Sequence, residues 1–250
     1  MVDVFKQKYG YEIEGIWFPR VTAIVSLTRR LGDRDRNQWL GRNGFWQAAQ
    51  WGQLAHETIE KILQGEQVRV EARIAIAIGA FQEWHAVHRI GVQDIERRVW
   101  DRKNGYAGTV DIIGTIGGIV GVIDLKTGTK ILREYALQTA AYMNAYQMSS
   151  GDEKTCTTRW ILRIDQYQEC MGCLAKRREK YGRAKVTGGK VICNHQWSPV
   201  KGEVELKELN GYKKDLEDFF ALKERWEWEH KELLKHIPNY TQYIRQYTLF

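Results

Sequence analysis

The chain has 250 residues, and its 43% of hydrophobic residues suffices for one folded core, which excludes a mostly disordered protein. The net charge of +7 and the pI of about 9.1 favour a polyanionic partner, because Lys and Arg that neutralise phosphates release condensed counterions. The apolar runs are too short to span a bilayer, and the N-terminal segment lacks the apolar stretch of a signal peptide. We therefore expect a cytoplasmic protein with no membrane partner.

The first half of the chain predicts two helices followed by a meander of three strands. Residues 45–63 and 71–88 have helical character, and the first of these segments contains no proline and ends before Gly65. Residues 92–100, 106–116 and 119–127 have the composition of strands. The dipeptides Asn104-Gly105 and Gly117-Gly118 predict the two hairpin turns between them.

The second half predicts a helix at 133–148, a strand at 157–165, a short edge strand at 202–209 and a charged helix at 211–234. Residues 166–200 are basic, glycine-bearing and cysteine-rich, and we interpret them as an insertion. The order of elements indicates an α/β fold in which a central mixed sheet is flanked by helices. We expect one domain over residues 1–250, with the Cys-rich insertion inside it.

Asp124 and Lys126 lie in the expected strand GVIDLKTG, where alternate side chains share a face. A carboxylate and an ammonium are costly to bury at the end of an apolar strand unless they are paired or bind a metal. Asp111, in the preceding strand, can approach Asp124 across the hairpin, and a divalent cation would relieve their repulsion. Nearby Gly108 and Gly121 favour close approach of a substrate backbone. The alternative is a surface ion pair and two unrelated surface aspartates.

Two helix faces supply further polar groups. Gly52, His56 and Glu60 are spaced four residues apart in WGQLAHETIE, so they line one face, and Gly52 leaves room there for a bulky partner. Gln138 and Tyr142 have the same spacing in LQTAAYMNAY. Each pair alone is unremarkable, since a single helical histidine is more often structural than a ligand.

Taken in chain order, the motifs G-x3-H-x3-E, G-T-V-D, G-V-I-D-L-K-T-G and Q-x3-Y resemble the RecB-like branch of the PD-(D/E)XK nuclease superfamily, which includes CRISPR-associated and phage-type exonucleases. The motifs run from Gly52 to Tyr142, and FPRVTAIVS at residues 18–26 extends the similarity. The resemblance implies a restriction-endonuclease-like core. It also implies a catalytic set made of His56, Asp111, Asp124, Lys126, Gln138 and Tyr142.

Within that set the resemblance implies different roles. The Mg²⁺ or Mn²⁺ ligands would be His56, Asp111, Asp124 and the carbonyl of Leu125. Lys126 would be the catalytic lysine, and Gln138 and Tyr142 would support it and contact the DNA. The chain departs from the family in lacking the signature proline before Asp124. It also lacks a cysteine before the core, where relatives with an iron–sulfur cluster have one.

The function implied is a metal-dependent DNA nuclease that hydrolyses phosphodiester bonds. We expect an exonuclease that acts on single-stranded or end-containing DNA in recombination, repair or phage-type replication. The alternatives are an inactive nucleic-acid-binding module of the same fold and an RNA-directed nuclease. Glu96, on the strand before Asp111, either assists the site or is a surface glutamate. The sequence identifies no protein partner.

The cysteines form a second group. Cys170, Cys173, Cys193 and His195 read C-x2-C-x19-C-x-H, a ligand set that could hold a structural zinc ion. Cys156 could replace His195 as the fourth ligand. The alternatives are free thiols in a flexible insertion, or an iron–sulfur cluster. The same insertion carries a basic run that either contacts phosphates or is solvated, namely Lys176, Arg177, Arg178, Lys180 and Arg183.

Overall fold

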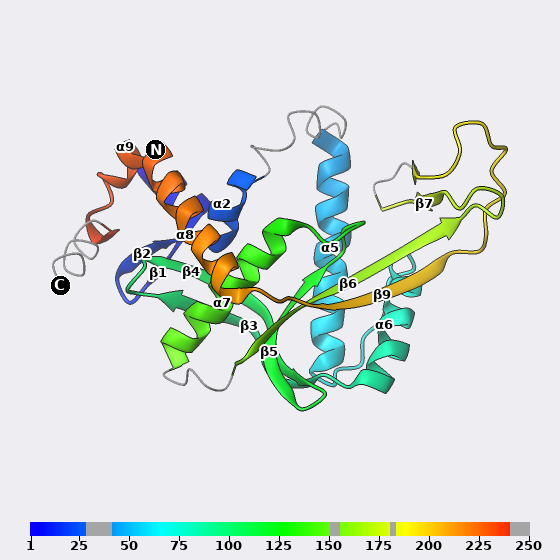
Figure 1. Cartoon of the computed structure of the whole chain (residues 1–250), viewed down its shortest axis with the longest axis horizontal. Helices are drawn as coiled ribbons and strands as arrows, with labels where there is room; N and C mark the ends of the chain where they lie inside the picture. Colours follow the sequence, from blue (N-terminus) through cyan, green and yellow to red (C-terminus); the bar gives the residue numbers. More distant parts are fainter. Residues whose placement is uncertain (29–41, 151–155, 181–183, 241–250) are drawn as a thin grey trace.

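The computed structural model describes residues 1–28, 42–150, 156–180 and 184–240, and it has a mixed sheet at its centre (Figure 1). Strands β3 (Gly91–Asp101), β4 (Tyr106–Ile116) and β5 (Ile119–Lys126) form an antiparallel meander. Gly105, Gly117 and Gly118 have positive φ angles of 68°, 58° and 84°, as the predicted Asn-Gly and Gly-Gly turns require. The meander therefore follows the sequence prediction closely.

The sheet becomes mixed after β5. Helix α7 (Arg133–Ser150) crosses over to β6 (Thr158–Glu169), which pairs with β5 in parallel. Strand β9 (Lys201–Glu208) pairs with β6 in antiparallel orientation. Two short strands, β7 (Lys176–Arg178) and β8 (Lys185–Thr187), continue the sheet beyond β6.

Strand β6 is longer than the sequence predicts. It continues past Asp165 through Glu169, because Gln166 and Tyr167 pair with β9 and Gln168 pairs with Arg177 in β7. The insertion, which from here on means residues 170–200, therefore begins at Cys170 and not at Gln166.

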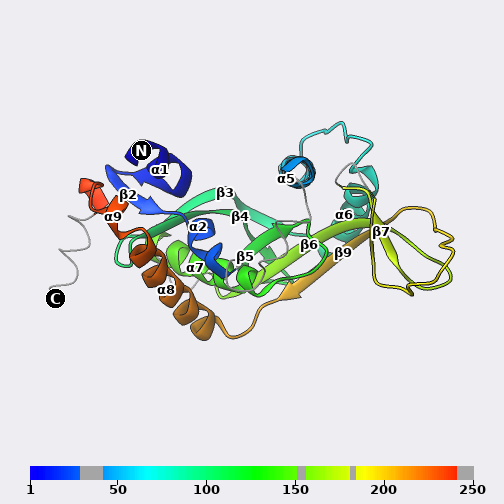
Figure 2. The same cartoon turned by 90° about the horizontal axis from the view of Figure 1, so that it is seen from above.

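Helices cover both faces of the sheet, as Figure 2 shows for α5 on one side and α7 and α8 on the other. Helix α7, α8 (Tyr212–Glu229) and the short α2 (Val21–Val25) enclose one core cluster, which contains Val110, Val122, Ala141 and Phe219. Helices α5 (Arg42–Leu63) and α6 (Ala75–His88) enclose a second, which contains Ile59, Ile78, Ile123 and Leu125. The predicted α/β architecture, a central mixed sheet flanked by helices, is confirmed.

The two ends of the described chain meet at one end of the sheet (Figure 1). The sequence did not predict α1 (Val2–Tyr9), β1 (Gly10–Ile13) or β2 (Ile16–Pro19). Phe5 and Trp17 from these elements share a core cluster with Trp226 of α8. The expected helix 211–234 is interrupted at His230, and α9 (Lys231–Leu234) follows it. In the described ranges, no helix has both the length and the apolar character of a membrane span.

Candidate active site

The hairpin of β4 and β5 brings the two predicted aspartates together. Ile112 pairs with Ile123, and the same register extended by one residue puts Asp111 opposite Asp124. Asp111 Oδ2 accepts a hydrogen bond of 2.7 Å from the backbone N–H of Leu125, in place of a ladder bond. Asp124 is completely buried. Two carboxylates therefore lie side by side where the hairpin pairing ends.

Lys126 lies on the same face of β5 as Asp124. Its Nζ is 2.5 Å from Asp124 Oδ2 and 4.9 Å from the ring centroid of Tyr135 in α7. Ile123 and Leu125 point to the opposite core cluster, so the predicted alternation is confirmed. Asp124 Oδ2 is therefore partnered by the Lys126 ammonium, and the two form a close buried ion pair.

Helix α7 fixes the orientation of Asp124. Gln138 Nε2 donates to Asp124 Oδ1 at 3.0 Å and lies 3.1 Å from the Tyr142 hydroxyl. Gln138 and Tyr142 are both buried. The structure thus pairs Gln138 with Asp124, whereas the resemblance implied that it supports Lys126, and it places both side chains in the interior. Their role in the site is to hold the carboxylate.

His56 joins the site from α5. Its Nδ1 is 3.9 Å from Asp111 Oδ2, and the ring is hydrogen bonded to the backbone of Leu125. Burial and the nearby Lys126 ammonium lower the pKa of His56 to about 4, so the imidazole is neutral at pH 7. A neutral imidazole is the form that binds a metal. The four ligands implied by the resemblance are therefore neighbours.

Two further carboxylates lie beside Asp111. Glu96 lies opposite it in the register of β3 and β4, with a φ of 50°, and forms a side-chain hydrogen bond with Glu60 of α5. Burial, followed by the charges of Glu96 and Asp111, raises the pKa of Glu60 to about 7. The sequence placed Glu60 on the His56 face of the helix, and that four-residue spacing was the signal that it belongs to the site.

The four carboxylates carry more negative charge than Lys126 can balance. Burial raises the pKa of Asp111 and of Asp124 to about 6 in each case, although the Lys126 ammonium opposes the shift. A buried carboxyl group with a raised pKa is one whose ionised form lacks full compensation. Carboxylate oxygens are donors of the type that Mg²⁺ and Mn²⁺ prefer.

Gly108 and Gly121 make room for protein side chains. A Cβ on Gly108 would lie 2.3 Å from the Tyr142 ring, and one on Gly121 would lie 2.5 Å from the Trp160 ring. The expectation that these glycines admit a substrate backbone is therefore wrong. Their function is to let Tyr142 and Trp160 pack directly on the strands.

We expect Gly108→Ala to destabilise the protein by about 1–3 kcal/mol, the usual cost of overpacking a core. Gly79→Ala in α6 is a matched control, because a Cβ at Gly79 meets nothing within 4 Å. The control should stabilise by about 0.5–1 kcal/mol, since alanine favours a helix over glycine. Urea unfolding of both variants measures the two effects, and equal midpoints for the two variants would contradict the packing described for Tyr142.

No model of a known protein family matches this chain, and no curated protein matches it.

A second ligand group lies in the insertion. One ligand atom from each of Cys170, Cys173, Cys193 and His195 lies within 4.8 Å of the others, so this group could hold a metal ion such as zinc. Burial raises the pKa of the Cys170 thiol, but hydrogen bonds from His195 and from two backbone amides outweigh it and lower the pKa to about 6. Cys156 belongs to the core cluster of α7 and α8, so it does not replace His195.

The basic run is largely neutralised within the protein. Arg178 and Lys180 are buried against Asp165, at 2.8 Å and 2.6 Å. Lys176 pairs with Glu203, and Arg177 pairs with Glu179. These ion pairs leave little of the run free for a phosphate, contrary to the expectation of a distal phosphate contact. Arg183 lies outside the described residues.

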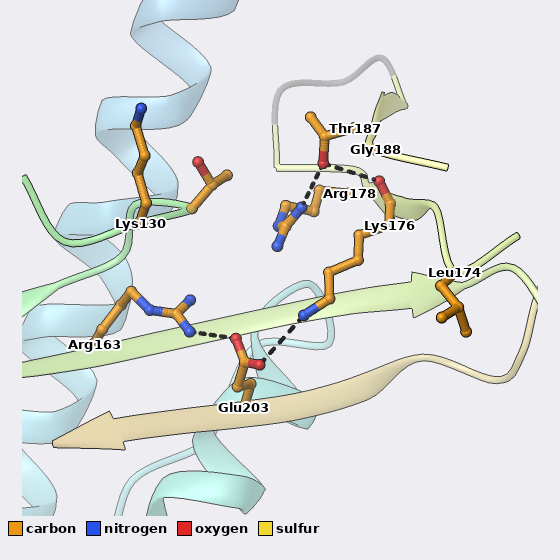
Figure 3. Close-up of a pocket in the computed structure, with 9 residues that line it drawn as sticks. Lys130, Arg163, Leu174, Lys176, Arg178, Thr187, Gly188 and Glu203 are labelled. Carbon is orange, nitrogen blue, oxygen red and sulfur yellow. Dashed lines mark hydrogen bonds and ion pairs between the residues drawn. The ribbon is translucent and has the colours of Figure 1, made fainter. Parts of the chain in front are cut away.

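A cavity of about 370 Å³ opens between the loop after β5 and the insertion (Figure 3). Lys130 lines it from the loop, and Arg163 and Glu203 line it from β6 and β9. Arg163 is paired with Glu203 across the floor of the cavity. The cavity therefore borders the segment that directly follows Lys126, on the side of the insertion.

Proposed function

We propose that the protein is a metal-dependent DNA nuclease with a PD-(D/E)XK-type core. The observation that carries the proposal is the completely buried Asp124 carboxylate, whose Oδ2 lies 2.5 Å from the Lys126 ammonium. Asp111 from the neighbouring strand and His56 from a helix stand beside it. These residues occur in the order and spacing of the nuclease motifs, and the antiparallel hairpin followed by a helical crossover is compatible with that core.

The residues that would hold Mg²⁺ or Mn²⁺ are Asp111, Asp124, His56 and the carbonyl of Leu125. The donor types fit, because they combine two carboxylates, a neutral imidazole and a backbone oxygen, although among the described residues His56, Asp111 and Asp124 do not form a close ligand group like that of Cys170, Cys173, Cys193 and His195. When bound, the cation polarises the scissile phosphate and lowers the pKa of a coordinated water. Gln138 keeps Asp124 in position through its 3.0 Å hydrogen bond.

Lys126 contributes a second positive charge to the site, in addition to that of the cation. Its ammonium is held between Asp124 and the face of the Tyr135 ring, which limits its motion. Held in this way, it can stabilise the charge that develops on the phosphate or orient the attacking water. Glu60 and Glu96 are hydrogen bonded to each other near Asp111, where burial raises the pKa of both and makes them groups that can exchange a proton.

DNA is the proposed substrate, in single-stranded form or with free ends. The net charge of +7 favours a polyanion, and RNA carries the same phosphates. An inactive binding module of the same fold is the competing function. It is disfavoured because each polar position of the constellation is filled and the residues lie together. We therefore propose phosphodiester hydrolysis at this site, in recombination, repair or phage-type replication.

The substrate class can be tested with labelled single-stranded DNA, duplex DNA and RNA of one sequence, each incubated with Mg²⁺, Mn²⁺, Ca²⁺ or EDTA. We expect cleavage of DNA with Mg²⁺ or Mn²⁺, and little with Ca²⁺, which coordinates loosely and at longer distances. Preferential cleavage of RNA would reassign the substrate. Binding without cleavage under all metal conditions would favour the inactive module.

A further inference from the structure

The four ligand atoms of the insertion lie within 4.8 Å of one another, and two of the distances between them match those of a tetrahedral metal site. Cys170 Sγ and Cys193 Sγ are 3.8 Å apart, and Cys173 Sγ is 3.4 Å from His195 Nδ1. For a tetrahedral zinc ion with bonds of ~2.3 Å to sulfur and ~2.05 Å to nitrogen, two sulfurs stand about 3.8 Å apart and a sulfur and a nitrogen about 3.6 Å. A disulfide requires ~2.05 Å between sulfurs, so the cysteines are not paired with each other.

The backbone around the ligands is shaped to bring them together. Leu174 N–H donates to the carbonyl of Cys170 at 2.9 Å and closes the turn that carries Cys170 and Cys173. Leu174 takes a φ of 61°, a strained left-handed conformation for a residue other than glycine. Gly189, which follows β8, lies close to Cys173. A Cβ added at Gly189 would be 2.8 Å from Cys173 Sγ. A turn held in this way needs a compensating interaction.

The part of the insertion that the structure describes has little apolar core to supply that interaction. Most of its large apolar side chains are turned to solvent, and those more than 40% exposed are Met171, Leu174, Val186, Val191, Ile192 and Val200. A segment without a core is commonly ordered by a structural metal, whose binding free energy then becomes folding free energy. In the insertion, the Cys and His ligands can supply this order by binding a metal.

We propose that Cys170, Cys173, Cys193 and His195 bind one structural zinc ion, and that the insertion ordered by this ion braces the catalytic strand through Lys180. The ligands join the turn before β7 to the segment after β8, so the ion closes the base of the β7–β8 hairpin. With three thiolates and one imidazole the coordination shell is closed, which is typical of a structural site. The second part of the inference rests on the proposed nuclease function.

Lys180 is the contact between the insertion and the candidate active site. It follows β7 and is 6% exposed, and its Nζ donates to the carbonyl of Thr127 at 2.7 Å. Thr127 directly follows Lys126. The same Nζ pairs with Asp165 of β6 at 2.6 Å and lies 4.2 Å from the ring of Trp51 in α5.

The contact also involves the helix that carries His56. Trp51 precedes Gly52, and a Cβ on Gly52 would lie 3.0 Å from Thr127 Oγ1. The close approach at Gly52 therefore lets α5 pack against the end of β5. Lys180 lies on this junction of three elements, so we assign it as a positioning residue that acts on Lys126 and His56 through Thr127 and Trp51.

The zinc site is tested by metal analysis of protein purified without chelators. We expect about one zinc per chain in the wild type, its loss in the Cys170→Ser/Cys173→Ser double variant, and its retention in Cys156→Ala, whose thiol lies in the core away from the cluster. Less than a tenth of an equivalent of zinc in the wild type would overturn the proposal. Visible absorbance with bound iron would overturn it in favour of an iron–sulfur cluster.

The brace is tested by hydrogen exchange of residues 126–132, which needs no catalytic readout. Lys180→Met should speed exchange there several-fold with zinc retained, Lys180→Arg should speed it less, and Lys185→Met, an exposed lysine in β8 of the same hairpin, should leave it unchanged. Zinc removal should speed exchange in the wild type and add little in Lys180→Met, because the two changes break one connection. Unchanged exchange in Lys180→Met, or additive effects, would overturn the brace.

Activity separates the brace from the proposed function. If the wild type cleaves DNA, Lys180→Met should lower kcat about tenfold with the Kd for DNA unchanged, since misplacing a catalytic group acts on the chemical step. Unchanged kcat would overturn the effect on the active site. If the wild type cleaves no nucleic acid, the proposed function fails, while the zinc analysis and the exchange data still decide the insertion.

Discussion

Asp124→Asn is expected to abolish DNA cleavage, by about a thousandfold or more, the upper range for loss of one electrostatic catalytic group. The amide keeps the shape of the side chain and its contact with Gln138, but it removes a charged ligand from the centre of the site. DNA binding should be retained or tighter, because a negative charge facing the phosphates is lost. Cleavage and binding of one labelled oligonucleotide measure both effects.

Metal-dependent stability gives Asp124→Asn a second readout. At a cation concentration of ~100 times Kd, the wild type should gain ~2.7 kcal/mol, which is roughly 5–10 °C in Tm for a chain of this size. The variant should gain little. Asp94→Asn, a partly exposed aspartate of β3, is the control and should behave like the wild type in both assays. Wild-type cleavage rates in Asp124→Asn would refute the assignment of the site.

The pH dependence of this stabilisation follows from the raised pKa values. Asp111 and Asp124 have pKa values of about 6 in the folded protein, above the ordinary value of 3.8. A group whose pKa is raised by folding contributes stability that is complete below its unfolded pKa and is lost as pH rises through the folded pKa. These carboxyls therefore weaken the metal-free protein above pH 6, and the Mg²⁺-induced rise in Tm should be small at pH 5 and large at pH 8.

Lys126→Met is expected to reduce cleavage by roughly three decades and to differ from Asp124→Asn in its response to metal. Without the ammonium, Asp124 is left buried with an uncompensated charge, and breaking a buried pair in this way costs ~3–5 kcal/mol. Lys126 is 18% exposed, so the lower end of that range applies. A bound cation neutralises the same carboxylate, so Mg²⁺ should raise the Tm of this variant at least as much as that of the wild type.

The control for Lys126→Met is Lys130→Met, which removes an exposed ammonium from the following loop. That variant should keep wild-type stability and cleave within a few-fold of the wild-type rate. If Lys126→Met cleaved within tenfold of the wild type, Lys126 would have no catalytic role. If it lost the Mg²⁺ response, its ammonium would instead be needed to shape the cation site.

The sequence predicted the meander of β3, β4 and β5 well, because alternation and turn dipeptides are local signals. The Asn104-Gly105 and Gly117-Gly118 turns fix that register, and the register is what brings Asp111 to Asp124. It predicted less well where structure depends on distant partners. The N-terminal elements are held by contacts such as that between Phe5 and Trp226, which no local pattern reveals.

The candidate site shows the same division. Strand alternation put Asp124 and Lys126 on one face, but it was the resemblance to the nuclease motifs that joined His56 to them. The hydrogen-bond partner of Gln138 could not be predicted from the sequence, because only the packing of α7 shows that its amide donates to Asp124. The ion pairs of the basic run could not be predicted for a related reason, because the acidic partner Asp165 lies in another strand, β6.

The proposed nuclease activity requires a cation held at the end of β5. The most direct measurement is the anomalous diffraction of a crystal containing Mn²⁺, using a preparation that cleaves DNA with Mn²⁺. We expect a manganese peak in contact with Asp111, Asp124, His56 and the Leu125 carbonyl, and no such peak in Asp124→Asn crystals soaked in parallel. A cleaving preparation whose manganese lies elsewhere, with no peak between Asp111 and Asp124, would contradict this proposal.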